Sequence, residues 1–300
     1  MDPRLDRTPS YLPYACRLEA QPDHLTPAWL IRPARPPAGP ADLFFNEGIT
    51  RRHHMLWVPD PATHVRSVFT LHPNTWTALR EWRSGGAAPA ANLLQLLRAA
   101  GIITTAEERA AAVADWQDAV SVSRSRLRGG FAPIRGLLHP FQLSALRRYF
   151  RCRIRRKQLP FGDPQCSRRY VAHDEPVASF FHRELAHVVS DLLGTPVKPS
   201  YCYFISYQPG AELPKHVDRE QCQYTLALCL DFSPEPACET TWPLKLQTPS
   251  EAVVVYQALG DALLYEGRRL PHFRNRLAEG CTSTSILFHY VDEGFSGPLS

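Results

Sequence analysis

Short stretches of alternating hydrophobic and polar residues follow one another in the last third of the chain. They cover residues 200–207, 223–232, 242–247, 251–257, 262–266, 270–277 and 282–291, and Pro, Gly, Ser or acidic residues separate them. Short strands at this close spacing are typical of an antiparallel sandwich or jelly roll, and not of alternating βα units. The pattern therefore predicts a C-terminal β domain.

Two segments before these strands have the period of amphipathic helices. The first carries seven cations between Arg147 and Lys157, together with apolar residues such as Leu146 and Phe150 at helical spacing. We interpret it as a helix that backs the β domain with a solvated basic face, because charge runs usually face solvent. Binding of an acidic peptide or nucleic acid is the alternative. The second segment, residues 177–193, predicts one helix in which His182 and His187 are packing or surface residues.

The first 130 residues have a different character. Eleven of the 28 prolines precede residue 62, which predicts a loop-rich opening. A strand at 68–71 and helices at 73–83 and 92–100 are expected next, followed by a helix from Thr105 with a capping-box pattern. This order resembles small winged-helix domains that present peptides to modifying enzymes. The alternative, which we favour, is a structural unit packed on the β domain through Trp76 and Trp82.

The triplet His216-Val217-Asp218 is the first candidate for chemistry. In an extended backbone, side chains two residues apart project to the same side, so His216 and Asp218 can reach one metal ion. The lone His272 at the start of a later strand is the best supplier of a third ligand. Two imidazoles and one carboxylate form the facial triad of non-heme Fe(II) oxygenases, which leaves coordination positions open.

These residues, together with their surroundings, carry a resemblance to a known family. Residues 207–210 read Tyr-Gln-Pro-Gly, Gly260-Asp261 leads a hydrophobic strand, and residues 282–290 form the last strand. Over residues 131–295, including a helical part expected from Phe131 onward, the chain resembles the Fe(II)/2-oxoglutarate dioxygenases, especially the prolyl hydroxylases. The resemblance implies that His216, Asp218 and His272 bind iron. It also implies that Tyr207, with Tyr203 beside it, contacts 2-oxoglutarate.

The chain departs from the family pattern at Thr282, where the family usually has an Arg or Lys for the far carboxylate of 2-oxoglutarate. A carboxylate in a partly dry pocket needs a charged or multiply hydrogen-bonding partner. We expect Arg274 to replace the missing cation, because it lies two residues after His272 and on the same side of the strand. Thr282 and Thr284 are expected to add hydroxyl donors. The rival cations are Arg268, Arg269 and Arg276.

Composition narrows the class of protein only slightly. With 44% hydrophobic and 21% charged residues and a net charge of +5, the chain is typical of a globular protein. No apolar run reaches membrane-spanning length, and a cytoplasmic location is expected. The eight cysteines contain no Cys-x-x-Cys pair. They are expected to be free and buried, although zinc binding through Cys222, Cys229 and Cys238 is an alternative.

The sequence therefore predicts an α+β protein. Residues 1–130 form a Pro-rich, mainly helical region, and residues 131–300 form a double-stranded β-helix, or jelly roll, with flanking helices. The resemblance implies an enzyme that uses Fe(II), 2-oxoglutarate and dioxygen to hydroxylate a C–H bond of an amino-acid residue in a peptide or of a free amino acid. A non-catalytic metal-binding sensor and a nucleic-acid demethylase are the alternatives. No membrane partner is expected, and nucleic acid is not favoured as a partner.

Overall fold

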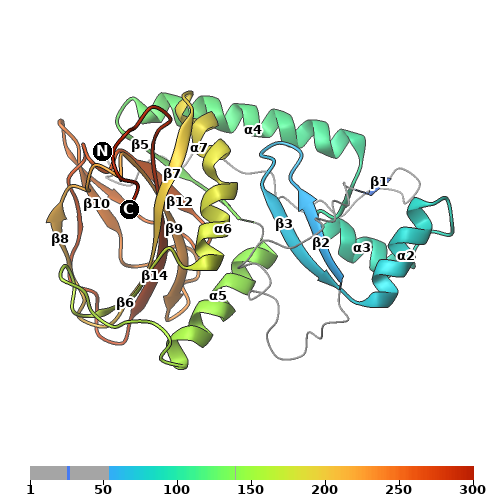
Figure 1. Cartoon of the computed structure of the whole chain (residues 1–300), viewed down its shortest axis with the longest axis horizontal. Coiled ribbons are helices and arrows are strands. Elements are labelled where there is room, and N and C mark those ends of the chain that lie inside the picture. The colour runs from blue at the N-terminus through green and yellow to red at the C-terminus, as the bar shows by residue number, and fades with distance from the viewer. Residues whose placement is uncertain (1–25, 28–53, 139) are drawn as a thin grey trace.

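The computed structural model describes residues 26–27, 54–138 and 140–300 (Figure 1). The N-terminal part contains, in order, β1 (Thr26–Pro27), β2 (His54–Pro59), β3 (Arg66–Leu71), α2 (Pro73–Arg83), α3 (Ala91–Ala99), β4 (Ile103–Thr104) and α4 (Ala106–Leu127). The rest contains β5 (Phe131–Ile134), α5 (Pro140–Arg155), β6 (Arg169–His173), α6 (Pro176–Glu184), α7 (Ala186–Leu193), β7 (Val197–Tyr207), β8 (Leu213–His216), β9 (Tyr224–Ser233), β10 (Leu244–Gln247), β11 (Ala252–Val255), β12 (Ala262–Tyr265), β13 (His272–Arg274) and β14 (Thr282–Asp292).

Two antiparallel sheets form the C-terminal part. The larger sheet has six strands in the order β5-β12-β9-β14-β7-β6, and the smaller has four in the order β11-β10-β13-β8. Apolar side chains of both sheets pack together between them, among them Ala227 and Leu263 of the larger sheet and Leu244 and Val253 of the smaller. This arrangement is a jelly roll, and the predicted α+β class is confirmed.

Alternation along the central strands of the larger sheet separates two environments. On β14, Ile286 and Phe288 belong to the main hydrophobic core on the helical side, whereas Ser285, Leu287 and His289 face the opposite way. Strand β7 follows the same rule, since Phe204 packs into the main core. Successive side chains of a strand point to opposite faces, so one face of the sheet is left for a cavity between the sheets.

Helices α5, α6 and α7 lie against the outer face of the larger sheet (Figure 1). The segment expected to form one helix at residues 177–193 is two helices, which corrects the prediction. Leu185, with φ −87° and ψ −5°, is both the C-cap of α6 and the N-cap of α7 and divides the two helices. Phe181, Leu185 and Val188 are all buried on the same side, so the hydrophobic period continues across the break and does not reveal it.

The helical part expected from Phe131 onward is also corrected, because residues 131–134 form strand β5. This strand pairs with β12 at one edge of the larger sheet, with Phe131 opposite Tyr265. An edge strand tolerates a proline such as Pro133, because one side of its backbone makes no ladder hydrogen bonds. The expected helix begins only at Pro140.

Helix α4 extends from the N-terminal part to the jelly roll (Figure 1). Its N-terminus has the predicted capping box, in which Thr105 Oγ1 accepts from the Glu108 amide and the Glu108 carboxylate accepts from the Thr105 amide. Trp116 and Ala119 of this helix belong to the main core. Strands β2 and β3 and helices α2 and α3 have a smaller core of their own, which ends at Ile103. The boundary at residue 130 remains a prediction.

The basic face of α5 makes several ion pairs. Arg147 and Arg151 both pair with Asp231, and Arg153 pairs with Glu175. The other four cations of the run are exposed: Arg148, Arg155, Arg156 and Lys157. The face is therefore solvated in part and ion-paired in part.

The described cysteines are all free. Four are buried, namely Cys166, Cys202, Cys222 and Cys229, as predicted; Cys152 and Cys281 are half-buried, and Cys16 lies outside the described residues. The prediction is wrong for Cys238, which is exposed. In the described part of the chain, no helix has the length and apolar character that crossing a membrane requires.

The smaller core allows a prediction about the stability of the N-terminal unit. Trp82 is partly buried against it, so Trp82→Ala should lower the free energy of unfolding by about 1–3 kcal/mol, less than the roughly 3–5 kcal/mol of a fully buried aromatic side chain. Leu96→Ala is the matched control, because Leu96 is 57% exposed in the same unit. Chemical denaturation measures both variants. Equal stability of Trp82→Ala and the parent would contradict the packing role.

Candidate metal centre

Two histidines meet across the antiparallel pair of β8 and β13. His216 and His272 are direct Cα partners in the register of this pair. Their ring centroids lie 4.3 Å apart. Cross-strand partners present their side chains on the same face of a sheet, which explains why residues 56 positions apart in sequence share one site.

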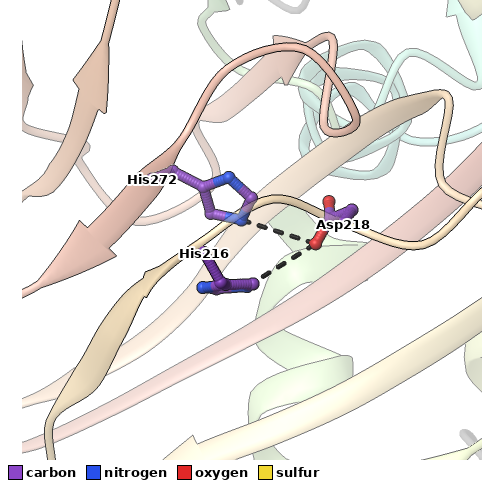
Figure 2. Close-up of side chains that lie close together, drawn as sticks. All are labelled: His216, Asp218 and His272. Atoms are coloured by element: carbon purple, nitrogen blue, oxygen red, sulfur yellow. Dashed lines mark ion pairs between the residues drawn. The ribbon is translucent and has the colours of Figure 1, made fainter.

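Asp218 lies just after β8 and completes the group shown in Figure 2. Its Oδ1 atom is 3.6 Å from His216 Nε2 and 3.5 Å from His272 Nε2. Its backbone amide donates to the carbonyl of Gly267 at 2.9 Å, which ties the residue to the segment that precedes β13. The group is well enclosed, since the His272 side chain is 3% exposed and that of Asp218 is 13% exposed.

The other nitrogen of each imidazole is also engaged. His216 Nδ1 lies 2.8 Å from the Pro214 carbonyl, and His272 Nδ1 lies 2.9 Å from the Leu270 carbonyl. A carbonyl oxygen can only accept, so each Nδ1 donates a hydrogen, and Nε2 is the nitrogen that each ring directs toward Asp218. Metal-binding histidines commonly have their second nitrogen fixed in this way.

The electrostatics of the group favour an ionised carboxylate. Burial opposes ionisation of Asp218, but hydrogen bonds from His216 and His272 outweigh it, so the pKa of Asp218 is lowered. Burial likewise tends to lower the pKa of His216, and its bond to Asp218 more than compensates, so that pKa is raised. An anionic carboxylate beside two imidazoles attracts a cation.

The three side chains fit a divalent metal ion. Their ligand atoms all lie within 4.8 Å of one another, and the set of two nitrogens and one oxygen is that of the Fe(II) facial triad. A second group, Asp218, Cys222 and His289, satisfies the same distance criterion. Burial raises the pKa of the Cys222 thiol to about 12, which disfavours the thiolate that binds metal. The first group is the better metal site.

A cavity of about 640 Å³ between the two sheets contains the three side chains in its wall. Its lining includes Tyr203, Tyr207 and Arg274, three of the residues that were predicted to bind the cosubstrate. A volume of this size is typical of small-molecule sites. The cavity therefore joins the candidate metal centre to the candidate cosubstrate residues.

Arg274 has an unusual environment for a guanidinium group. It is 8% exposed, donates a hydrogen bond to the Trp242 carbonyl and lies 4.8 Å from the centre of the Trp242 ring. In the part of the chain that the structure describes, no carboxylate pairs with it. Burial lowers its pKa, but an arginine stays charged at neutral pH. A buried cation without an anion is costly, so this position suits an anionic ligand.

Tyr207 provides a neutral hydroxyl in the same cavity. Its oxygen accepts a hydrogen bond from Arg169 Nη1 at 2.9 Å, which leaves its own hydrogen available to donate. Burial raises the pKa of Tyr207, so the hydroxyl stays protonated. Tyr203 instead donates to Asp163 Oδ2 at 2.9 Å, and Asp163 is ion-paired with Arg169. Tyr207 is thus the better hydrogen-bond donor to a ligand.

The other sequence candidates lie away from the cavity wall. Thr282 and Thr284 share the side of β14 that carries Ile286, and the Thr284 hydroxyl bonds that of Ser206 at 2.8 Å. The odd-numbered Ser285 lines the cavity in their place. The rival cations are exposed, and none of them is part of the lining: Arg268, Arg269 and Arg276.

Comparison with known proteins adds a likeness in fold. Neither a protein-family model nor a curated protein matches the chain. Similar solved structures include a Pseudomonas putida prolyl-4-hydroxylase, with 14% identity, a TM-score of 0.48 and coverage of 58% of this chain and 100% of that one. The α-ketoglutarate-dependent epimerase SnoN of nogalamycin biosynthesis has 13% identity, a TM-score of 0.49 and coverage of 59% and 82%.

A third similar structure is HygX from Streptomyces hygroscopicus with nickel, 2-oxoglutarate and hygromycin B bound. It has 18% identity, a TM-score of 0.44 and coverage of 56% of this chain and 84% of that one. The similar structures thus include a hydroxylase, an α-ketoglutarate-dependent epimerase and a protein with 2-oxoglutarate bound. At these identities the likeness concerns the fold, and we base no residue role on it.

Sequence reasoning missed three residues around the site. Arg169 is on β6, a strand that was not predicted, and it reaches Tyr207 only through sheet pairing. Gly267, which lies between β12 and β13, and Thr225, which lies on β9, both contact Asp218. No motif in the sequence links either residue to Asp218. A basic residue in the short alternating stretch 169–173 was the one available signal for Arg169.

The metal assignment is tested by removing each ligand. His216→Ala, Asp218→Ala and His272→Ala should each abolish stoichiometric Fe(II) binding, because three protein ligands are the minimum for this centre. Anaerobic equilibrium dialysis measures the bound iron. His64→Asn is the control, since His64 is exposed and its φ of 58° is tolerated by asparagine. Parental iron stoichiometry in all three alanine variants would refute the site.

Gly267 gives a second prediction, because there is no room for a side chain between this residue and Asp218. A Cβ atom at this position would lie 2.2 Å from Asp218 Oδ2 and 2.9 Å from Thr225 Oγ1. Gly267→Ala should therefore displace the carboxylate and weaken Fe(II) binding by roughly 10–100-fold, as loss of ligand orientation does. Gly294→Ala is the matched control, because no atom lies within 4 Å of its added Cβ. Equilibrium dialysis measures the Fe(II) affinity of both variants. Unchanged Fe(II) affinity in Gly267→Ala would contradict the role of Asp218 as a ligand.

Proposed function

We propose that this protein is an Fe(II)- and 2-oxoglutarate-dependent oxygenase that hydroxylates a C–H bond of an amino-acid residue or another small molecule. In the overall reaction, substrate, 2-oxoglutarate and dioxygen give hydroxylated substrate, succinate and carbon dioxide. When bound, the iron and the 2-oxo acid supply the oxidising chemistry. His216, Asp218 and His272 would hold the iron, which leaves its other coordination positions open.

Arg274 is the observation that carries the proposal. Its buried guanidinium, without a carboxylate partner among the described residues, lines the same cavity as the three metal-binding candidates. A dicarboxylate that binds the metal through one end and Arg274 through the other satisfies both ends of this cavity. Tyr207 would donate its hydroxyl hydrogen to the same ligand.

Trp242 holds the Arg274 and Tyr207 side chains in position. Trp242 contributes its carbonyl and its ring face to Arg274, and its ring packs on Tyr207 with centroids 4.9 Å apart. The Arg274 and Tyr207 side chains are thus held in place by the same tryptophan. Groups positioned in advance lose little entropy when the ligand binds.

The cavity also has room for a substrate. His173 and Tyr201 are part of its lining, with their rings stacked and their centroids 4.7 Å apart. The cavity volume of about 640 Å³ suits a dicarboxylate together with a small molecule or a single side chain. This supports an amino acid, a residue of a peptide or a similarly sized substrate.

The alternatives make different predictions. A metal-binding sensor would bind Fe(II) and the dicarboxylate without producing succinate. A nucleic-acid demethylase would depend on the basic helix α5, where Arg147, Arg151 and Arg153 are engaged in ion pairs. A cytoplasmic location remains a prediction, as does the presence of a separate domain at residues 1–130.

The cosubstrate assignment is tested with the full chain under anaerobic conditions. A 2-oxo acid bound to Fe(II) through two oxygens gives a visible charge-transfer band, and titration of that band gives the dissociation constant. Arg274→Ala should weaken 2-oxoglutarate binding by about 1.5–3 kcal/mol, roughly 10–150-fold, because a charge-assisted hydrogen bond is lost. Fe(II) binding without 2-oxoglutarate should be retained.

Arg268→Ala is the control for this titration, because Arg268 is exposed and lies outside the cavity. Its dissociation constant should equal that of the parent. If Arg268→Ala is affected and Arg274→Ala is not, the anchor has been assigned to the wrong residue. If the parent shows no band and releases no succinate in air, the oxygenase proposal fails.

A further inference from the structure

A buried polar chain supports the side of Asp218 that faces away from the two imidazoles. Thr225 Oγ1 lies 3.0 Å from Asp218 Oδ2 and 3.0 Å from His289 Nδ1. Thr225 is fully buried, and His289 is 3% exposed. Both residues are on neighbouring strands of the larger sheet, where His289 of β14 is the register partner of Thr225 of β9.

The direction of these hydrogen bonds is determined by their chemistry. A carboxylate can only accept, so the single hydroxyl hydrogen of Thr225 goes to Asp218. The Thr225 oxygen must then accept from His289 Nδ1. The His289 ring therefore carries a hydrogen on Nδ1. A chain of this kind strengthens each of its bonds in a low-dielectric interior.

The His289 backbone is itself held firmly. Its carbonyl oxygen accepts from His182 Nε2 at 2.7 Å. The support of Asp218 therefore leads through Thr225 and His289 to the helical side of the sheet. Neither Thr225 nor His289 belongs to the candidate triad.

We propose that Thr225, backed by His289, is a positioning residue that holds the Asp218 carboxylate so that Oδ1 alone is offered to the metal. This inference rests on the proposed metal centre and gives a reason why its carboxylate would bind through one oxygen. A carboxylate that used both oxygens would occupy one more coordination position. The hydroxyl of Thr225 would therefore preserve room for the dicarboxylate and dioxygen.

The same region has a competing interpretation. In it, the second group, Asp218, Cys222 and His289, would bind a metal itself. Thr225 makes the two uses distinguishable. In the positioning role, removal of its hydroxyl releases Asp218 and weakens binding at the triad. In the competing role, the same removal frees Asp218 Oδ2 and His289 Nδ1 and strengthens binding.

The experiment measures Co(II) binding to the full chain by calorimetry and by the ligand-field spectrum. Thr225→Val keeps the shape of the side chain but loses the hydroxyl, and it should bind Co(II) roughly 10–100-fold more weakly with an altered spectrum. Thr225→Ser keeps the donor and should restore affinity to within about threefold of the parent. His289→Phe should give a smaller loss, because the bond between Thr225 and Asp218 remains.

Thr63→Val is the matched control. Thr63 is also fully buried, and its hydroxyl donates to the Asp60 carboxylate at 2.9 Å, away from the cavity. This variant should lose thermal stability but bind Co(II) as the parent does. The comparison separates loss of a buried hydroxyl in general from loss of this particular one. If Thr225→Val does not fold, Thr225→Ala removes the same hydroxyl without the branched side chain.

The outcomes are distinct. Weaker binding in Thr225→Val, with recovery in Thr225→Ser, supports the positioning role. Parental or tighter binding in Thr225→Val overturns it, while binding by the parent still supports the metal centre. If the parent itself binds no Co(II), both the metal centre and this inference are refuted.

Discussion

The pairing of β8 with β13 is the constraint on which the site depends. This pair places His216 opposite His272, and the bond from the Asp218 amide to the Gly267 carbonyl extends the contact beyond the end of β8. Backbone hydrogen bonds thus bring the three candidate ligands together.

The alternation of side chains along the strands of the larger sheet positions the other residues of the cavity. On β7 and β14 one set of side chains builds the main core with helices α5, α6 and α7, and the other set faces the cavity. Close packing on the helical side restrains the strands, which in turn restrain Tyr207 and His289. The wall of the cavity is therefore supported by a core on the opposite face of the same sheet.

Polar groups inside this cavity are unevenly satisfied. Asp163 and Arg169 neutralise each other, and Asp218 is bonded on both carboxylate oxygens. Arg274 is the exception, because its described partners are a carbonyl and an aromatic face. A buried cation without an anionic partner is costly, and this cost is the basis for proposing that Arg274 binds an anionic ligand.

Sequence alone determined the parts that depend on local periodicity and local chemistry. The strand pattern predicted the jelly roll, the capping box predicted the start of α4, and the His-x-Asp triplet with His272 predicted the three residues that meet. Arg274 was found because residues two apart on a strand share a side, and both it and His272 line the cavity. These inferences depend on neighbours in the chain, which a sequence displays directly.

Tertiary structure decided everything that depends on partners distant in sequence. Strand β5 was mistaken for a helix because four residues that include a proline have no clear period, and only pairing with β12 makes them a strand. The break at Leu185 was hidden because both helices bury the same side. Thr225, Arg169 and Gly267 acquire their roles across the sheet, where no spacing rule in the sequence applies. Long-range register, and not local propensity, places these side chains around Asp218.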